Sequence, residues 1–280
     1  MRLNFCVQRR VKELDLRFEN YCLPKFVLNS SSLTVLKLSQ LKLEAPSLST
    51  LPSLKVLSLH VECDAKSLQN LISGCPIIEE LYLWGHGKIR FDFTVSETLR
   101  NLTLKCVDLT DQWLSGLISG LPFLERLTLE CYLLGKINVR SHSLKYFIFQ
   151  STSYHIEVAL SLPNLVYLHF ACVPNAIISV EAPNLLEAHL SFFYCNLNQR
   201  LYFTLVHLLS NLNCSKKLTL TIRDERVLIF PKRVKKKCAS PLPNLNHLKV
   251  KMCGRLTEES ELRDSLLWCA PSTETLEIGR

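Results

Sequence analysis

The sequence predicts an α/β solenoid in which short strands stack side by side into a parallel sheet. Residues 117–131 nearly copy residues 71–85, which lie 46 positions earlier. The core of this copy is an apolar residue, two variable residues, Leu, one variable residue and a further apolar residue, and it recurs along the whole chain. Repeats of about 20 to 29 residues with this core define leucine-rich repeats. We therefore expect a leucine-rich-repeat horseshoe with a parallel concave sheet.

The repeat core occurs at twelve places, and their middle residues are spaced by 20 to 30 positions. The inward apolar residues of a core are two positions apart, which is strand periodicity, so the residue between them faces the other way. A well-buried Leu contributes about 1.5 to 3 kcal/mol, and it does so only when neighbouring repeats cover it. The middle residues are Leu14, Leu36, Leu57, Leu81, Leu102, Leu127, Phe147, Leu168, Ala188, Leu218, Leu248 and Leu276.

The segments between the strands differ in length, which predicts a mixed convex side. Residues 67–73 and 113–119, in the 24- and 25-residue units, carry apolar residues at helical spacing, and Gly74 and Gly120 follow as C-caps. Shorter units leave less room, so residues 137–139 and 177–180 are predicted to be extended. Helical patterns return at 201–209 and 262–267, while 231–243 is predicted to be a basic, proline-flanked loop.

Composition and cysteine usage indicate a soluble cytoplasmic or nuclear protein. Hydrophobic residues make up 48% of the 280, yet no apolar run reaches the roughly 20 residues that a membrane span needs. Residues 1–10 lack the apolar core of a secretory signal. The twelve cysteines are scattered without any Cys-x-x-Cys pair, which favours buried thiols in a reducing compartment. Cys106, Cys131 and Cys172 are expected on the inward face of their strands.

One local cluster accounts for most of the net charge of +8. Its five basic residues resemble a nuclear localisation signal, and without them the charge would be +3. A solvated loop, or a surface that binds an acidic partner, would give the same pattern. The cluster consists of Lys232, Arg233, Lys235, Lys236 and Lys237.

Candidate partner-binding residues alternate with the inward residues and project from the concave face, the surface that solenoids use for binding. Aromatic side chains are favoured as interface anchors, although packing between neighbouring strands would also place aromatic residues there. We expect contact with a protein substrate through Tyr82, Trp84, Tyr146, Tyr167, His169 and His189.

The sequence offers little for catalysis or cofactor binding. His169 and His189 occupy equivalent positions on adjacent strands, but only Glu187 could complete a metal site with them. Glycine-rich phosphate loops, nucleophile elbows and His-Glu-x-x-His patterns do not occur. We therefore expect no metal, no cofactor and no enzymatic activity.

The order of motifs resembles the plant F-box proteins that carry leucine-rich repeats and a C-terminal FBD segment. The resemblance rests on residues 11–16, 32–39, 51–59 and 73–81. Residues 242–248, 266–271 and 274–278 are similar to the FBD segment, except that Ser and Thr follow Pro271 where an apolar residue is usual. This similarity divides the chain into a repeat array, 1–213, and FBD-like repeats, 214–280, that continue the solenoid.

The resemblance implies the substrate-binding part of an F-box ubiquitin-ligase receptor. Such proteins carry an N-terminal F-box of some 40 residues that docks a Skp-type adaptor and so joins a cullin. Here the repeats begin by Val11, and ten residues cannot hold an F-box, so adaptor and cullin are expected only with a longer form. The alternative is an F-box-less scaffold or decoy that binds the same kind of partner. Neither membrane nor nucleic acid is an expected partner.

Overall fold

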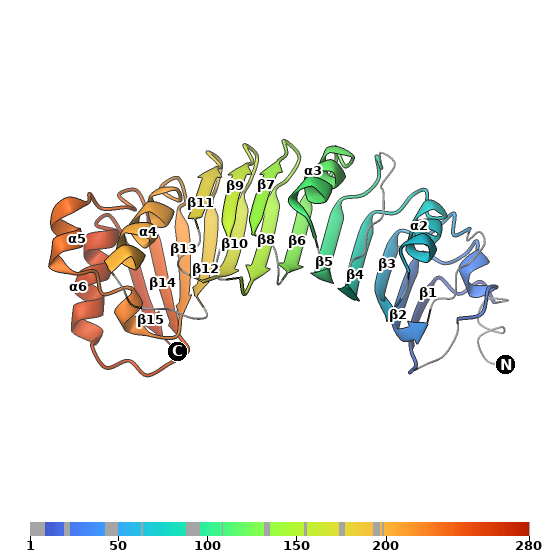
Figure 1. The fold of residues 1–280 in the computed structure, drawn as a ribbon, viewed down its shortest axis with the longest axis horizontal. Coiled ribbons are helices and arrows are strands. Elements are labelled where there is room, and N and C mark those ends of the chain that lie inside the picture. The colour runs from blue at the N-terminus through green and yellow to red at the C-terminus, as the bar shows by residue number, and fades with distance from the viewer. Residues whose placement is uncertain are drawn as a thin grey trace. The chain divides into compact units, whose positions relative to one another are not determined.

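The computed structural model describes residues 9–19, 23–42, 50–62, 64–87, 96–107, 109–131, 135–153, 156–173, 177–192, 197 and 199–279. The chain forms two compact units, Met1–Cys131 (unit 1) and Tyr132–Arg280 (unit 2). Figure 1 labels the helices and strands of both units.

Unit 1 contains parallel strands whose order in the sheet follows the order in the chain. The predicted middle residues pair with one another in register, from Leu14 with Leu36 through to Leu102 with Leu127. Leu36, Leu57 and Leu102 are fully buried, which confirms the predicted inward face. The strands are β1 (Glu13–Arg17), β2 (Val35–Lys42), β3 (Val56–Glu62), β4 (Glu80–Gly87), β5 (Asn101–Val107) and β6 (Arg126–Cys131).

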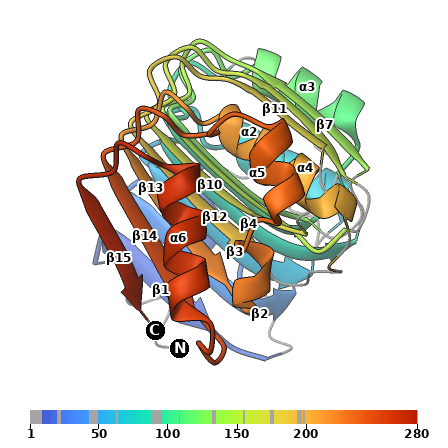
Figure 2. The same ribbon diagram turned by 90° about the vertical axis from the view of Figure 1, so that its left-hand side faces the viewer.

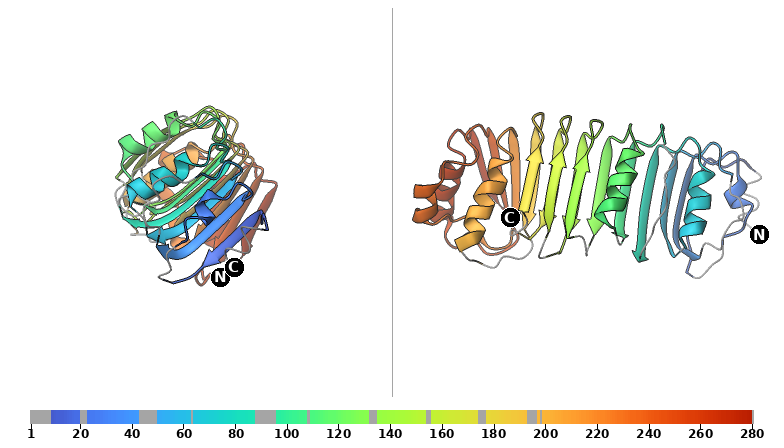
Figure 3. Two further views of the ribbon diagram at one scale, coloured as in Figure 1. Left: turned by 90° about the vertical axis from the view of Figure 1, so that its right-hand side faces the viewer. Right: turned by 45° about the horizontal axis from the view of Figure 1, so that its top comes forward.

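Helices α2 (Ala65–Ser73) and α3 (Asp111–Ser119) confirm the two predicted helices of unit 1. Each begins at a side chain that accepts a backbone N–H, Asp64 from Ser67 and Thr110 from Trp113. Gly74 and Gly120 are the C-caps, both with right-handed φ near −80°. The left panel of Figure 3 shows α2 and α3 on one side of the strands. A short 3-10 helix, η1 (Val27–Asn29), precedes β2.

Unit 2 contains a main parallel sheet, in which Phe147, Leu168, Ala188, Leu218, Leu248 and Leu276 pair in register. Its strands are β8 (Tyr146–Ser151), β10 (Tyr167–Cys172), β12 (Glu187–Phe192), β13 (Lys217–Ile222), β14 (His247–Met252) and β15 (Thr275–Gly279). A second, 3-stranded parallel sheet has the order β11-β9-β7. It comprises β7 (Lys136–Arg140), β9 (Glu157–Ser161) and β11 (Ile177–Glu181). The predicted extended segments at 137–139 and 177–180 are thus confirmed.

Helices α4 (Gln199–Ser210) and α6 (Glu259–Cys269) confirm the predicted helical patterns in unit 2. Figure 2 shows α4, α5 (Lys232–Lys237) and α6 on the same side of the main sheet. A 3-10 helix, η2 (Glu225–Val227), follows β13.

The predicted loop at 231–243 is wrong in its first half, because residues 232–237 form α5. Lys and Arg are good helix formers. The side chain of Val234 is only 3% exposed, and its burial anchors α5 against the rest of the unit. One apolar residue among basic ones gave no helical period in the sequence, so the helix was not predicted.

The predicted boundary between residues 213 and 214 lies inside unit 2, where β12 and β13 pair in register across it. Cys131 and Cys172 are buried thiols, as predicted, whereas the side chain of Cys106 lies outside the described residues. In the described parts of the chain, no helix is both long and apolar enough to cross a membrane.

Candidate protein-interaction surface

Each main sheet has an outward face, defined by the strand residues that alternate with the buried ones. In β8, for example, Tyr146, Ile148 and Gln150 are half-buried while Phe147 and Phe149 are fully buried. Figures 2 and 3 show the helices of each unit on the opposite, inward side of its strands. Among the described residues, no helix therefore covers the outward faces, and only the side chains of the strands lie there.

Four of the predicted anchor residues lie together on the outward face of unit 2. Tyr146 and Tyr167 are register partners on β8 and β10, and their ring centroids are 6.3 Å apart at a tilt of 40°. His169 and His189 are register partners on β10 and β12, with centroids 4.6 Å apart and planes within 13°. The strand pairing thus produces a continuous surface of four rings.

The histidine pair is held in its neutral form. Burial lowers the pKa of His169, and burial together with the charges of His169 and Lys251 lowers the pKa of His189 to about 4. His189 Nε2 lies 3.0 Å from Thr221 Oγ1. His169 Nε2 is buried and has no hydrogen-bond partner within the described part of the chain. Two neutral imidazoles can stack face to face without charge repulsion.

The predicted third metal ligand, Glu187, does not join this pair as a cluster. It lies one outward position before His189 on β12 and is exposed. The described residues contain no group of three or more His, Cys, Asp or Glu side chains that could hold a metal ion.

The remaining two predicted anchors lie on the outward face of unit 1. Trp84 is 38% exposed and stacks on His60 of the neighbouring strand, with centroids 3.9 Å apart and planes within 5°. Tyr82 is half-buried, and Lys105 Nζ lies 6.0 Å from its ring centroid. His60 was missed, although it occupies the position equivalent to Trp84 in the preceding repeat.

A pocket of about 520 Å³, which was not predicted, lies at the carboxyl ends of the main strands of unit 2. Most of its surface is apolar, and the described residues that line it include one arginine and no carboxylate. Its walls are formed by Gln150, Thr152, Ser191, Phe192, Thr221, Ile222, Arg223 and Cys253.

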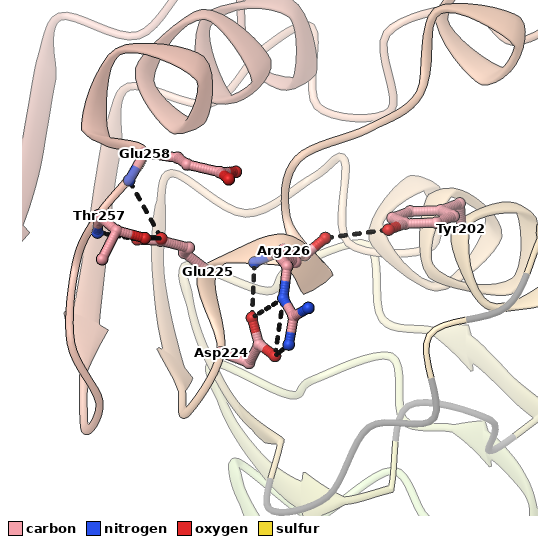
Figure 4. Close-up of polar contacts among 6 residues, drawn as sticks. All are labelled: Tyr202, Asp224, Glu225, Arg226, Thr257 and Glu258. Atoms are coloured by element: carbon pink, nitrogen blue, oxygen red, sulfur yellow. Dashed lines mark hydrogen bonds and ion pairs between the residues drawn. The ribbon is translucent and has the colours of Figure 1, made fainter.

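A polar network fixes the turns that follow β13 and β14 (Figure 4). The pocket residues Arg223 and Cys253 directly follow these two strands. Arg226 donates from its backbone N–H and its guanidinium to Asp224, with the shortest N···O distance 2.6 Å. Glu225 is 4% exposed and accepts from the backbone N–H groups of Thr257 and Glu258 and from the Thr257 hydroxyl. The Asp224 contacts stabilise the first turn, and the Glu225 contacts join the two turns to each other.

The basic cluster is carried by α5, away from the strands. Lys232, Arg233, Lys236 and Lys237 are exposed, Lys235 is half-buried, and Val234 between them is buried. These charges lie on one short helix, and the predicted roles of the cluster remain predictions.

Comparison with known proteins agrees with this architecture. The family model described as "FBD-associated F-box protein At5g56370, LRR repeats" matches residues 3–101 and 90–278. The chain is 27% identical over 286 residues to the putative F-box/LRR-repeat protein At4g15060 of Arabidopsis thaliana, covering 97% of this chain and 56% of that protein. It is 35% identical over 114 residues to the F-box/FBD/LRR-repeat protein At4g26340 of the same plant, covering 36% and 27%.

A third relative, the F-box protein At4g09920 of Arabidopsis thaliana, is 28% identical over 202 residues, which are 67% of this chain and 55% of that protein. The chain thus spans about half, or less, of the length of these curated relatives. No solved structure matches the chain.

The stacked strands, buried leucines and open outward faces define a leucine-rich-repeat protein, an architecture that presents extended surfaces for protein interaction. Because the family model covers nearly the whole chain, the chain belongs to the plant F-box proteins with FBD-associated leucine-rich repeats.

Proposed function

We propose that this chain is the substrate-binding part of an F-box ubiquitin-ligase receptor. The observation that carries the proposal is the four-ring surface of unit 2, where the tyrosine pair and the histidine pair lie side by side on an open sheet face. Clustered aromatic residues account for much of the binding energy of protein interfaces. The names of the matched relatives support the ligase context, because each of them is an F-box protein.

The binding half of this proposal is tested by affinity purification with the chain as bait in plant extract. Tyr146→Ala/Tyr167→Ala is expected to weaken capture of its specific partner about 30-fold, since hot-spot truncations reach about 2 kcal/mol or more. Lys136→Ala/Glu157→Ala is the matched control, because this exposed pair lies on the second sheet of the same unit with its charges 3.6 Å apart. Equal capture by both double variants would reject the four-ring surface as the binding site.

The ligase half needs a separate experiment, because it depends on an F-box. The chain alone is expected not to capture a Skp-type adaptor, whereas the chain fused behind an F-box should capture adaptor and cullin. Ubiquitination of the captured partner by the fusion would support the receptor role. A partner that is bound by the fusion but never modified would favour the scaffold or decoy instead.

We place this activity in the cytoplasm or nucleus, supported by the described cysteines, which are thiols rather than disulfides, and by the exposed basic helix. A fluorescent fusion is expected to lose nuclear accumulation when Lys235, Lys236 and Lys237 are replaced by Gln. Unchanged distribution would exclude an import role for α5.

A further inference from the structure

The pocket of unit 2 is suited to an anion. Gln150, Thr152, Ser191 and Thr221 are among its lining residues, Arg223 adds a positive charge, and no described lining residue is acidic. Its volume falls within the range of about 300 to 1,000 Å³ that is typical of ligand sites. Phe192 and Ile222 supply apolar surface beside these polar groups.

The charge of Arg223 is left without a carboxylate partner. Asp224 is held by Arg226 through two guanidinium nitrogens, and Glu225 is held by Thr257 and Glu258. Among the described residues, Arg223 therefore forms no ion pair, although two acidic residues directly follow it in the chain.

Lys251 adds a second unpaired charge at the same end of the sheet. It is exposed, is the register partner of Thr221, and forms no ion pair within the described part of the chain. The neighbouring Lys249, by contrast, is paired with Glu277. The local positive potential is also felt by His189, whose pKa the charge of Lys251 helps to lower.

Close backbone contacts hold the rim of the pocket. Cys253 N–H donates to the carbonyl of Ile222 at 2.8 Å. At Gly254, an added Cβ would lie 2.2 Å from the carbonyl oxygen of Arg223, so the two turns approach as closely as only glycine allows. The Glu225 carboxylate then joins the same turns at Thr257. A preformed rim loses little conformational entropy on binding.

The geometry points to recognition of an acidic peptide segment, whose Asp or Glu side chain enters this pocket and pairs with Arg223, with Lys251 beside it. This inference rests on the proposed function, because a protein substrate lying across the four-ring surface would supply the segment. Carboxylate and guanidinium form strong charge-assisted hydrogen bonds, and the hydroxyl groups of the pocket can donate to the same carboxylate.

The test uses a phage-displayed library of random dodecapeptides selected on the whole chain. We expect the selected peptides to be enriched in Asp and Glu, and to bind Arg223→Gln/Lys251→Gln about tenfold more weakly by fluorescence anisotropy. Arg140→Gln/Lys216→Gln removes the same charge from two exposed positions of the same unit, at the end of β7 and just before β13, and is expected to leave binding unchanged. Arg223→Lys alone should retain most of the binding, and thermal melting verifies that every variant is folded.

Selected peptides without acidic enrichment, or equal losses in the two double variants, would overturn the inference. Complete displacement of the peptides by free glutamate at millimolar concentration would also overturn it, because the site would then serve a small carboxylate. Failure of this inference can be distinguished from failure of the proposed function. If the partner captured in plant extract depends on Tyr146 and Tyr167 but not on Arg223 and Lys251, the acidic-segment inference fails and the recognition role stands.

Discussion

Replacing Glu225 by Gln tests whether the turns beside the pocket are held by a buried carboxylate. The native carboxylate accepts three donors, at 2.9 Å from Thr257 N, 2.5 Å from Thr257 Oγ1 and 3.1 Å from Glu258 N. Glutamine keeps one acceptor oxygen but turns its NH₂ group toward the Thr257 N–H. Hydrogen bonds to charged groups contribute about 1.5 to 3 kcal/mol and neutral ones about 0.5 to 1.5 kcal/mol, so we expect a local loss of about 2 kcal/mol.

Hydrogen exchange measured by mass spectrometry over residues 255–262 reports this loss directly. A loss of about 2 kcal/mol corresponds to about 30-fold faster exchange of these amides at neutral pH. Asp264→Asn is the matched control, because it removes one negative charge from an exposed position of α6. Exchange in Glu225→Gln no faster than in this control would refute the reasoning.

Acidification gives a second, independent readout. Burial raises the pKa of Glu225, but the hydrogen bonds from Thr257 and Glu258 outweigh burial and leave the pKa below its ordinary value of 4.5. The stability that Glu225 contributes is therefore present above pH 4.5 and is lost as the pH falls through the lowered pKa. The difference in exchange between the wild type and Glu225→Gln should shrink over that range, and a constant difference would contradict the charge argument.

Three further outcomes are expected. Gly254→Ala should lower the free energy of unfolding by about 1 to 3 kcal/mol. An unchanged melting temperature would show that the turn shifts to accommodate the added methyl group. Leu57→Ala, at a site with 0% exposure, should lose about 2 to 5 kcal/mol in urea unfolding, whereas Ile77→Ala, 39% exposed, should lose far less. His189 should remain neutral by NMR from pH 7 down to about pH 5 and titrate near 4. The stability linked to it falls as the pH drops from 6.5 toward 4, and Lys251→Gln should raise its pKa.

The repeat architecture was predictable because an inward strand position recurs in every unit. Leu57 and Leu81 are 24 residues apart in the sequence, yet both have to be register partners if their side chains are to be buried. Segment length also separated the helical connections from the extended ones. The six proposed anchors were placed on outward faces by the same alternation, but their role as binding residues stays a prediction.

Features that depend on contacts between different turns were not predictable. Glu225 and Thr257 are 32 residues apart, and nothing in either local sequence indicates that one accepts from the other. The pocket beside them was not predictable for the same reason, because its lining comes from the ends of β8, β12, β13 and β14. Helix α5 depends on the burial of a single residue, Val234. A helix is recognised in a sequence by apolar residues that recur at helical spacing, and a single apolar residue cannot show such a spacing.

The second sheet of unit 2 has β11 at one edge, and unpaired edges invite strands from other chains. Here α4 packs against β11. Asn211, just beyond that helix, donates to the carbonyl oxygen of Ile178 at 3.1 Å. An incoming strand would meet a helix and an occupied carbonyl instead of free backbone groups. A strand of another chain therefore cannot extend the second sheet at β11 by backbone hydrogen bonding. The same obstruction protects this edge against self-association between copies of the protein.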